Sequence, residues 1–274
     1  MKSNRGWLEV VGIGIRAPEQ TTIEVSDKIR RADKVYSLVA DPLAEYWIRT
    51  LNTETESLGY LYAEGKERRE TYREMVERIV GSVLQNLGVC AVAYGHPGVA
   101  SYPLHESVRR VRAEGLPAQM VAGISAEDCL FADLGVDPIK SGCLSYEATD
   151  FLIHRRVIDV TSNLILWQIG VIAESGFKPG YDLWNRDGLA VLAQRLLEEY
   201  RPDHEVVIYS AAQLPMCSAT ITRIRLQQLP FAPVTILSTL YVPPMESPKI
   251  DHAMLHRLGI PPELLDSRAG SPGG

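Results

Sequence analysis

The stretch "WLEVVGIGI" (residues 7–15) is a short apolar run that ends in glycines, which is typical of a buried strand followed by a tight turn. Helical spacing follows over 22–33, and "KVYSLV" (34–39) is a second strand. The same order returns downstream, where a helix predicted over 67–88 leads into the strand and loop "VCAVAYGHPGV" (89–99). This alternation of strands and helices predicts an α/β fold with a mostly parallel sheet.

The second half of the chain has a different pattern. Strands are expected over 164–170, 205–211 and 235–243, with a helix over 188–200. Too little sequence separates the last two strands for an ordinary crossover helix, so we expect mixed or antiparallel pairing there. The change of pattern places a boundary near residues 115–120. The predicted division is an N-terminal α/β domain (1–117), a C-terminal α/β domain (118–245) and an extension with a tail (246–274).

Composition excludes several classes of protein. The chain has 274 residues, of which 46% are hydrophobic, and a net charge of −6, which disfavours a nucleic-acid partner. No apolar stretch is long enough to span a membrane, and the N-terminus lacks the apolar core of a signal peptide. The four cysteines are widely spaced and form no CxxC pair, so neither a metal site nor a disulfide framework is expected. A reduced cytoplasmic enzyme without metal is the expectation.

Three loops contain glycine at the ends of predicted strands. Gly12 and Gly14 form a G-x-G, but Ala17 stands where a dinucleotide fingerprint has its third glycine, and no helix begins there. An NAD site is therefore disfavoured, which leaves a tight turn or another ligand loop. In the second loop, "YGHPGV" (94–99), the glycines can take positive φ. The third loop ends at Ser125, which is placed to cap a helix.

Taken together, these segments resemble the tetrapyrrole methylase superfamily, and within it the borosin peptide backbone α-N-methyltransferases. The resemblance covers the chain from about residue 8 to residue 260. It implies two α/β domains with the cofactor between them. The matching segments are "EGKERRETYREM" (64–75), "YGHPGV" (94–99), "AGISAEDCLFADLGVDP" (122–138), "GCLSYEATDFLI" (142–153), "LILWQIG" (164–170), "HEVVIYSAA" (204–212) and "STLYVPP" (238–244).

The resemblance implies S-adenosylmethionine as the cofactor. From the residues alone, Tyr209 and Gln168 are typical of core positions with a satisfied polar tip, and Ser125 of a helix cap. The positions that match the family's cofactor contacts are Tyr94, His96, Val99, Ser125, Ala126, Gln168, Tyr209, Ser210, Ala211, Ser238 and Thr239.

Tyr62, Arg68 and Tyr72 lie in the charged run "LYAEGKERRETYREM" (61–75). On its own, such a run is typical of a solvated helix with Glu/Arg pairs. Arg68 and Tyr72 are four residues apart and are expected on one helical face. The resemblance implies instead that the three residues match a catalytic Tyr/Arg/Tyr set that faces the peptide.

The chemistry of backbone N-methylation suits these residue types. An amide nitrogen is a poor nucleophile because its lone pair is delocalised into the carbonyl. Arg68 is expected to stabilise negative charge on the oxygen, Tyr72 to remove the amide proton, and Tyr62 to donate a hydrogen bond to the oxygen. One position departs from the family, since Gly59 stands where fused members often carry a further tyrosine. The neighbouring Tyr60 is the candidate substitute.

Fused borosin proteins carry their core peptide at the C-terminus. The end of this chain, "RAGSPGG", does not resemble an apolar core peptide, so we expect a split system with a separate precursor peptide. The resemblance also implies a homodimer, with a heterotetramer containing two peptides as a further form. The segments "LAEYWIRTL" (43–51) and "YVPPM" (241–245) are the expected interface material. Two alternatives stay open: C-methylation of a tetrapyrrole-like small molecule, and a non-catalytic peptide-binding relative.

Overall fold

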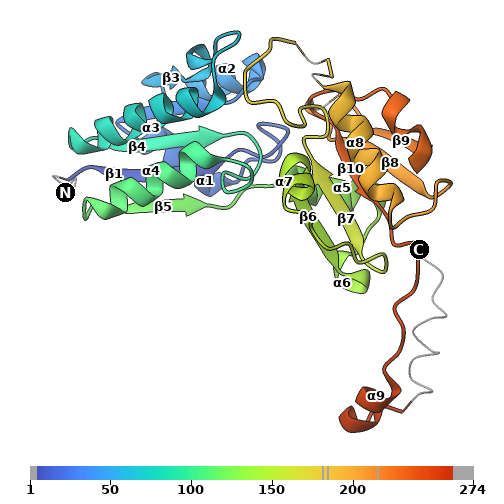
Figure 1. Ribbon diagram of the computed structural model, residues 1–274. Helices are drawn as coiled ribbons and strands as arrows, with labels where there is room; N and C mark the ends of the chain where they lie inside the picture. The colour runs from blue at the N-terminus through green and yellow to red at the C-terminus, as the bar shows by residue number, and fades with distance from the viewer. Residues whose placement is uncertain (1–4, 181, 184, 215, 262–274) are drawn as a thin grey trace.

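The first half of the chain folds around one parallel sheet (Figure 1). Its order is β3-β2-β4-β1-β5, and every neighbouring pair of strands is parallel. The strands are β1 (Trp7–Gly12), β2 (Lys34–Leu38), β3 (Thr55–Ser57), β4 (Gly88–Ala93) and β5 (Ala118–Val121). The structure is a computed structural model that describes residues 5–180, 182–183, 185–214 and 216–261, so the predicted tail beyond residue 261 lies outside it.

Helices cover both faces of this sheet. Apolar side chains of α3 and α4 pack on one face, around Met75, Ile79 and Leu104. Those of α1 and α2 pack on the other, around Ile29 and Ile48. The bounds are α1 (Ile23–Arg31), α2 (Pro42–Leu51), α3 (Arg68–Leu84) and α4 (Tyr102–Ala113), with a 3₁₀ turn η1 (Gly59–Leu61) before α3.

The predicted parallel α/β order of the first half is confirmed. Strand β5 pairs with β1 in parallel, with Leu8 opposite Ala118 and Val11 opposite Val121. The first sheet therefore extends past the boundary placed near residues 115–120. The reason is that α4 acts as a crossover helix, so the chain returns to the same sheet before it leaves it.

The second half folds around a mixed sheet of order β6-β7-β10-β8-β9. Strand β10 is antiparallel to both β7 and β8, as expected from the short separation of the last two predicted strands. That strand begins only at Thr239, because residues 235–238 form a turn in which the Ser238 side chain accepts a hydrogen bond from the Thr235 N–H. The strands are β6 (Cys143–Glu147), β7 (Asn163–Trp167), β8 (Glu205–Ser210), β9 (Thr220–Arg225) and β10 (Thr239–Val242).

Two separate apolar clusters enclose the mixed sheet. The larger lies under α7, α8 and η2 and contains Phe151 and Leu192. The smaller lies under α5 and contains Leu130 and Tyr209. The bounds are α5 (Ala126–Leu134), α6 (Pro138–Ser141), α7 (Ala148–Ile153), α8 (Arg186–Leu197), η2 (Leu226–Phe231) and α9 (His252–Leu258).

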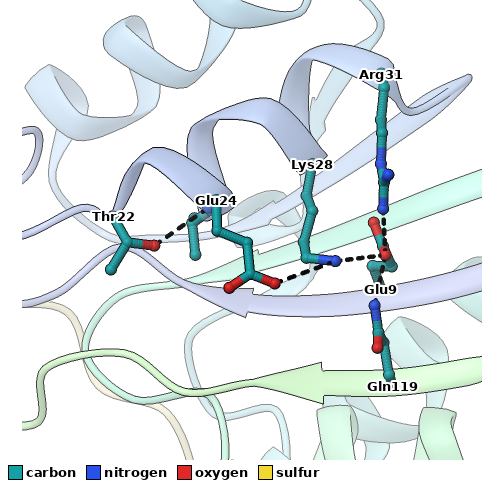
Figure 2. Close-up of polar contacts among 7 residues, drawn as sticks. Glu9, Thr22, Glu24, Lys28, Arg31 and Gln119 are labelled. Atoms are coloured by element: carbon teal, nitrogen blue, oxygen red, sulfur yellow. Dashed lines mark hydrogen bonds and ion pairs between the residues drawn. The ribbon is translucent and has the colours of Figure 1, made fainter.

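A buried carboxylate, Glu9, joins three elements of the first half (Figure 2). Only 6% of Glu9 is exposed. Its Oε1 accepts hydrogen bonds from Lys28 at 2.7 Å, Arg31 at 2.5 Å and Gln119 at 2.6 Å. Lys28 and Arg31 extend from α1, and Gln119 from β5, so the three contacts tie the edge strand and the covering helix to β1 (Figure 2).

Burial on its own raises the pKa of Glu9, but hydrogen bonds from Arg31, Lys28 and Gln119 outweigh it, and the net effect is a lowered pKa. A carboxylate with a lowered folded-state pKa contributes stability above its unfolded-state pKa of about 4.3. That contribution is lost as the pH falls through the folded-state pKa. Acid unfolding of the protein is therefore expected to be steeper than that of a variant without this carboxylate.

Replacing Glu9→Gln is expected to lower the free energy of unfolding by about 3–5 kcal/mol, because buried Lys28 loses its close buried partner and keeps only the exposed Glu24. Glu24→Gln is the matched control, since Glu24 also contacts Lys28, at 3.5 Å, but is 64% exposed. Its expected cost is at most about 1 kcal/mol. Urea unfolding of both variants near neutral pH measures the difference, and equal costs would contradict the role given to burial.

Candidate functional site

Three glycine loops meet at the carboxyl edge of the parallel sheet. The Gly95 N–H donates to the Gly14 carbonyl at 2.7 Å, and Gly95 has a φ of 68°. A Cβ on Gly123 would lie 2.6 Å from the Gly95 oxygen and 2.9 Å from the Gly12 oxygen. The loops after β1, β4 and β5 are thus packed backbone against backbone. Gly98 lacks the expected positive φ; its small size instead admits the His96 ring and the Met120 sulfur.

Replacing Gly123→Ala is expected to destabilise the protein by about 1–3 kcal/mol, because backbone atoms cannot move aside for the new methyl group. Gly81→Ala on α3 is the control, since a Cβ there has no atom within 4 Å. In a helix interior that change is expected to stabilise by about 0.5–1 kcal/mol. Thermal melts are expected to show a lower melting temperature for Gly123→Ala and a higher one for Gly81→Ala. An unchanged melting temperature in Gly123→Ala would contradict the tight packing of the loops.

The first group of predicted cofactor residues lies at these loops. Tyr94 and Val99 follow β4 and are 58% and 45% exposed. His96 is half-buried, and its Nδ1 accepts a hydrogen bond from the Gly98 N–H at 2.9 Å. Ser125 caps α5, which begins at Ala126, and its side chain is already engaged by Asp128. The Ser125 hydroxyl is therefore a helix cap, as the residues alone indicated.

The second group lies at one end of the central strands of the mixed sheet. Because β10 is antiparallel to its neighbours, its first residue, Thr239, lies opposite Tyr209 near the end of β8, next to the end of β7. Gln168, Ser210, Ala211 and Ser238 flank these strand ends. The structure thus gathers six of the predicted residues at the ends of β7 and β8 and the start of β10: Gln168, Tyr209, Ser210, Ala211, Ser238 and Thr239.

From the residues alone, Tyr209 and Gln168 are both predicted to be core residues, and the structure gives different outcomes for the two. Tyr209 is a core residue, since it is buried and its hydroxyl donates to Asp133 at 2.8 Å. Gln168 is not, because it follows β7, is only half-buried and has a φ of 61°. A non-glycine residue in this conformation is strained, and such strain is concentrated at ligand sites.

The structure brings Tyr62, Arg68 and Tyr72 together. Tyr62 ends the η1 turn, Arg68 is the first residue of α3, and Tyr72 lies one turn further along. Burial raises the pKa of Tyr62, the neighbouring Tyr72 raises it further, and Arg68 opposes the shift. The phenol of Tyr62 therefore stays protonated near neutral pH and can act as a hydrogen-bond donor.

The surroundings of this set differ from those of a solvated helix. Tyr62, Arg68 and Tyr72 are half-buried, whereas Arg69 and Arg73 on the same helix are exposed. Tyr60 does not join the set, since it is 57% exposed and its hydroxyl donates to Glu56 at 3.2 Å. The structure thus gives Tyr60 a partner of its own.

A segment of the second half, residues 174–177, holds the start of α3. We call it the strap. The Arg68 N–H donates to the Ser175 carbonyl at 2.9 Å, and the Arg68 guanidinium donates to the Glu174 carbonyl. The Phe177 N–H donates to Lys66, and the Phe177 ring lies 5.1 Å from the Tyr62 ring. The strap contacts Tyr62 and Arg68 from the second half of the chain, and no local pattern in the sequence indicated it.

Phe177→Ala is expected to slow turnover at this candidate site about 10-fold or more, because Tyr62 loses the ring that lies 5.1 Å from its own. Phe177→Leu, which restores much of the lost apolar volume, is expected to recover part of the rate. Phe231→Ala is the control, since Phe231 is 84% exposed and distant from the strap in the sequence. Single-turnover rates separate positioning from substrate binding, and an unchanged rate would show that the strap does not orient Tyr62.

The described part of the chain offers neither a metal-binding cluster of side chains nor a membrane-spanning helix. There, no group of three or more His, Cys, Asp or Glu side chains is placed to hold a metal ion. Nor is any helix in this part both long and apolar enough to cross a membrane.

The fold is similar to those of solved methyltransferases. Uroporphyrin-III C-methyltransferase from Thermus thermophilus aligns with a TM-score of 0.62 and 18% identity, over 91% of this chain and 99% of that one. A cobalt precorrin-4 methyltransferase aligns with a TM-score of 0.60 and 15% identity, over 86% and 94%. The fold and the glycine loops define the chain as a two-sheet α/β protein of the same fold class as these structures.

Residues 8–230 match the family model of the Tetrapyrrole (Corrin/Porphyrin) Methylases, and the chain belongs to that family of methyltransferases. A methyltransferase and gymnopeptide precursor from Gymnopus fusipes is 41% identical over 88% of this chain and 58% of its own length. The corresponding omphalotin A precursor from Omphalotus olearius is 38% identical over 95% and 63%. A type I borosin cyclic peptide precursor from Coprinopsis marcescibilis is 40% identical over 87% and 62%. The chain thus spans about three fifths of the length of these relatives.

Proposed function

We propose that this chain transfers a methyl group from S-adenosylmethionine to backbone amides of a ribosomally made precursor peptide supplied as a separate chain. The observation that carries the proposal is the half-buried cluster of Tyr62, Arg68 and Tyr72. Tyr72 also lines a hollow on the surface of α3 and α4, which would give a separate peptide access to the cluster. Relatives named as methyltransferase and borosin peptide precursor support the choice of a peptide substrate.

The loops fit the methyl donor chiefly through their backbone. The side chains of Ser125, Ser238 and Tyr209 already have partners within the protein. The glycines of these closely packed loops would let the donor approach the backbone near Tyr94, His96 and Val99. Ala126, at the start of α5, offers a helix N-terminus to a carboxylate. Gln168, Ser210, Ala211 and Thr239 would complete the site from the mixed sheet.

When bound, S-adenosylmethionine supplies an electrophilic methyl group on a sulfonium. Arg68 would stabilise the negative charge that develops on the amide oxygen. Tyr62, which stays protonated, would donate a second hydrogen bond to that oxygen. Tyr72, as its phenolate, would accept the amide proton and become a neutral phenol, which leaves the nitrogen with a lone pair for attack. The strap would hold Arg68 and Tyr62 in position, so that the rate depends on contacts across both halves of the chain.

Methylation of a separately added peptide tests the function. Mass spectrometry is expected to show mass increases of one or more methyl groups on the peptide, on backbone nitrogen in fragment spectra. Calorimetry is expected to show binding of S-adenosylhomocysteine and none of NAD, given the incomplete dinucleotide fingerprint. Methylation on carbon of a tetrapyrrole, with the peptide untouched, would establish the other reaction of the family. Donor binding with no transfer to either would support the non-catalytic alternative.

We propose a homodimer in solution, with a heterotetramer containing two peptides as the loaded form, in the cytoplasm. Leu43 and Tyr46 on α2 are 63% and 70% exposed, which supports an interface there. The second expected segment does not contribute in the same way, because Tyr241 and Val242 are buried in the mixed sheet. The four cysteines are free, as in a reducing compartment. Light scattering that reports only a monomer would contradict the assembly.

A further inference from the structure

A hollow of about 730 Å³ lies on the outer side of α3 and α4, beside the proposed catalytic cluster. Tyr72, Val76 and Tyr102 contribute its apolar surface, and the Tyr72 and Tyr102 rings lie 6.4 Å apart. Arg69 and Arg73 stand at its side on α3. A ligand in this hollow would therefore lie against Tyr72 while meeting two guanidinium groups.

The charges in the hollow do not cancel. Both glutamates that line it are already paired: Glu77 accepts from Arg110 at 2.6 and 3.2 Å, and Glu106 accepts from Arg109 at 2.6 and 2.7 Å. Among the described residues, Arg69 and Arg73 take part in neither an ion pair nor a hydrogen bond. The hollow thus presents two unpaired guanidinium groups on a chain whose net charge is −6.

The shape of the surface favours an extended ligand. A second hollow of about 350 Å³ continues along α3 and shares Arg73 and Glu77 with the first. Guanidinium groups bind carboxylates through paired hydrogen bonds. The net charge of −6 on the chain disfavours the continuous phosphate backbone of a nucleic acid.

We propose that the α3–α4 hollow binds an acidic segment of the substrate peptide, with Arg69 and Arg73 holding its carboxylates and Tyr72, Val76 and Tyr102 packing against a neighbouring apolar residue. This inference rests on the proposed function for the nature of the ligand. It adds a preference for acidic residues next to the methylated segment. It also separates the two roles of α3, since Arg68 and Tyr72 act on the amide while Arg69 and Arg73 select the peptide.

Fluorescence anisotropy with two labelled synthetic peptides tests the inference. Both contain valine and glycine, one with adjacent aspartates and the other with asparagines in their place. The Arg69→Gln/Arg73→Gln variant is expected to bind the aspartate peptide about 10-fold more weakly, which corresponds to two partly exposed ion pairs. Binding of the asparagine peptide is expected to be unchanged. Added salt is expected to weaken binding of the aspartate peptide in the wild type only.

Arg30→Gln/Arg223→Gln is the matched control, because it removes the same charge from exposed arginines on α1 and β9. It is expected to leave the preference for aspartate intact. If both double variants lose the same affinity for the aspartate peptide, the effect is due to net charge alone, and the inference is overturned. A dimer that dissociates in the first variant, with no aspartate preference in the wild type, would assign the hollow to a second copy of the chain. Anisotropy measures peptide binding and not methyl transfer. The binding result therefore stands even if the methylation proposal fails.

Discussion

Replacing Tyr72→Phe is expected to slow methyl transfer to the peptide by about 10²–10⁴-fold, the usual effect of losing a general base. The change removes one hydroxyl and little volume, and Tyr72 is only half-buried, so the fold is expected to survive. Affinity for S-adenosylhomocysteine is expected to stay the same, since the hydroxyl would face the peptide. Single-turnover mass spectrometry of the peptide measures the rate.

Tyr60→Phe is the matched control, because it makes the same chemical change at an exposed tyrosine whose hydroxyl contacts Glu56. Its rate is expected to be close to that of the wild type. The rate of Tyr62→Phe is expected to lie between those of Tyr60→Phe and Tyr72→Phe, since Arg68 would still stabilise the amide oxygen. A wild-type rate in Tyr72→Phe would remove the residue from the mechanism and leave the solvated-helix interpretation of this run in its place.

Replacing Arg68→Lys is expected to lower the rate by about 10²–10³-fold, the effect of losing one preorganised donor to a developing negative charge. Lysine keeps the charge but not the planar fork of donors. In this structure part of that fork is used by the strap, since the guanidinium donates to the Glu174 carbonyl. Lysine is not expected to reach the strap and the substrate in the same geometry.

Arg78→Lys on the same helix is the control, because Arg78 is 53% exposed and lies 3.5 Å from Glu56. It is expected to change neither the rate nor the melting temperature appreciably. Thermal melts of Arg68→Lys separate a loss of strap contacts from a loss of catalysis. If the melting temperature falls while the rate of the remaining folded protein is unchanged, Arg68 is structural and not catalytic.

The sequence was most informative where local patterns carry the structure. Apolar runs over 7–15 and 89–99 with intervening helical spacing predicted the parallel sheet of the first half, and that prediction is confirmed. The N-cap at Ser125 could also be predicted, because the cap and Asp128 lie within one turn of each other. Arg68 and Tyr72 were expected on one face from their spacing, and both are half-buried on α3.

Local sequence patterns therefore determined strands β1, β2, β4, β7, β8 and β10, helices α1, α3 and α8, and the glycine loops, since each depends on residues close together in the chain. The Tyr/Arg/Tyr set was implied by the family resemblance and not by the local pattern. Tertiary structure alone decided how far the first sheet extends, because the pairing of β5 with β1 joins residues about 110 positions apart, as the contact of Gln119 with Glu9 shows. It alone decided the strap, because main-chain hydrogen bonds from residues 174–177 to the start of α3 leave no trace in side-chain type. Within the described residues, it alone also left Arg69 and Arg73 without a hydrogen bond or close ion pair, since ion pairing depends on which helices lie side by side and not on the order of charges along one of them.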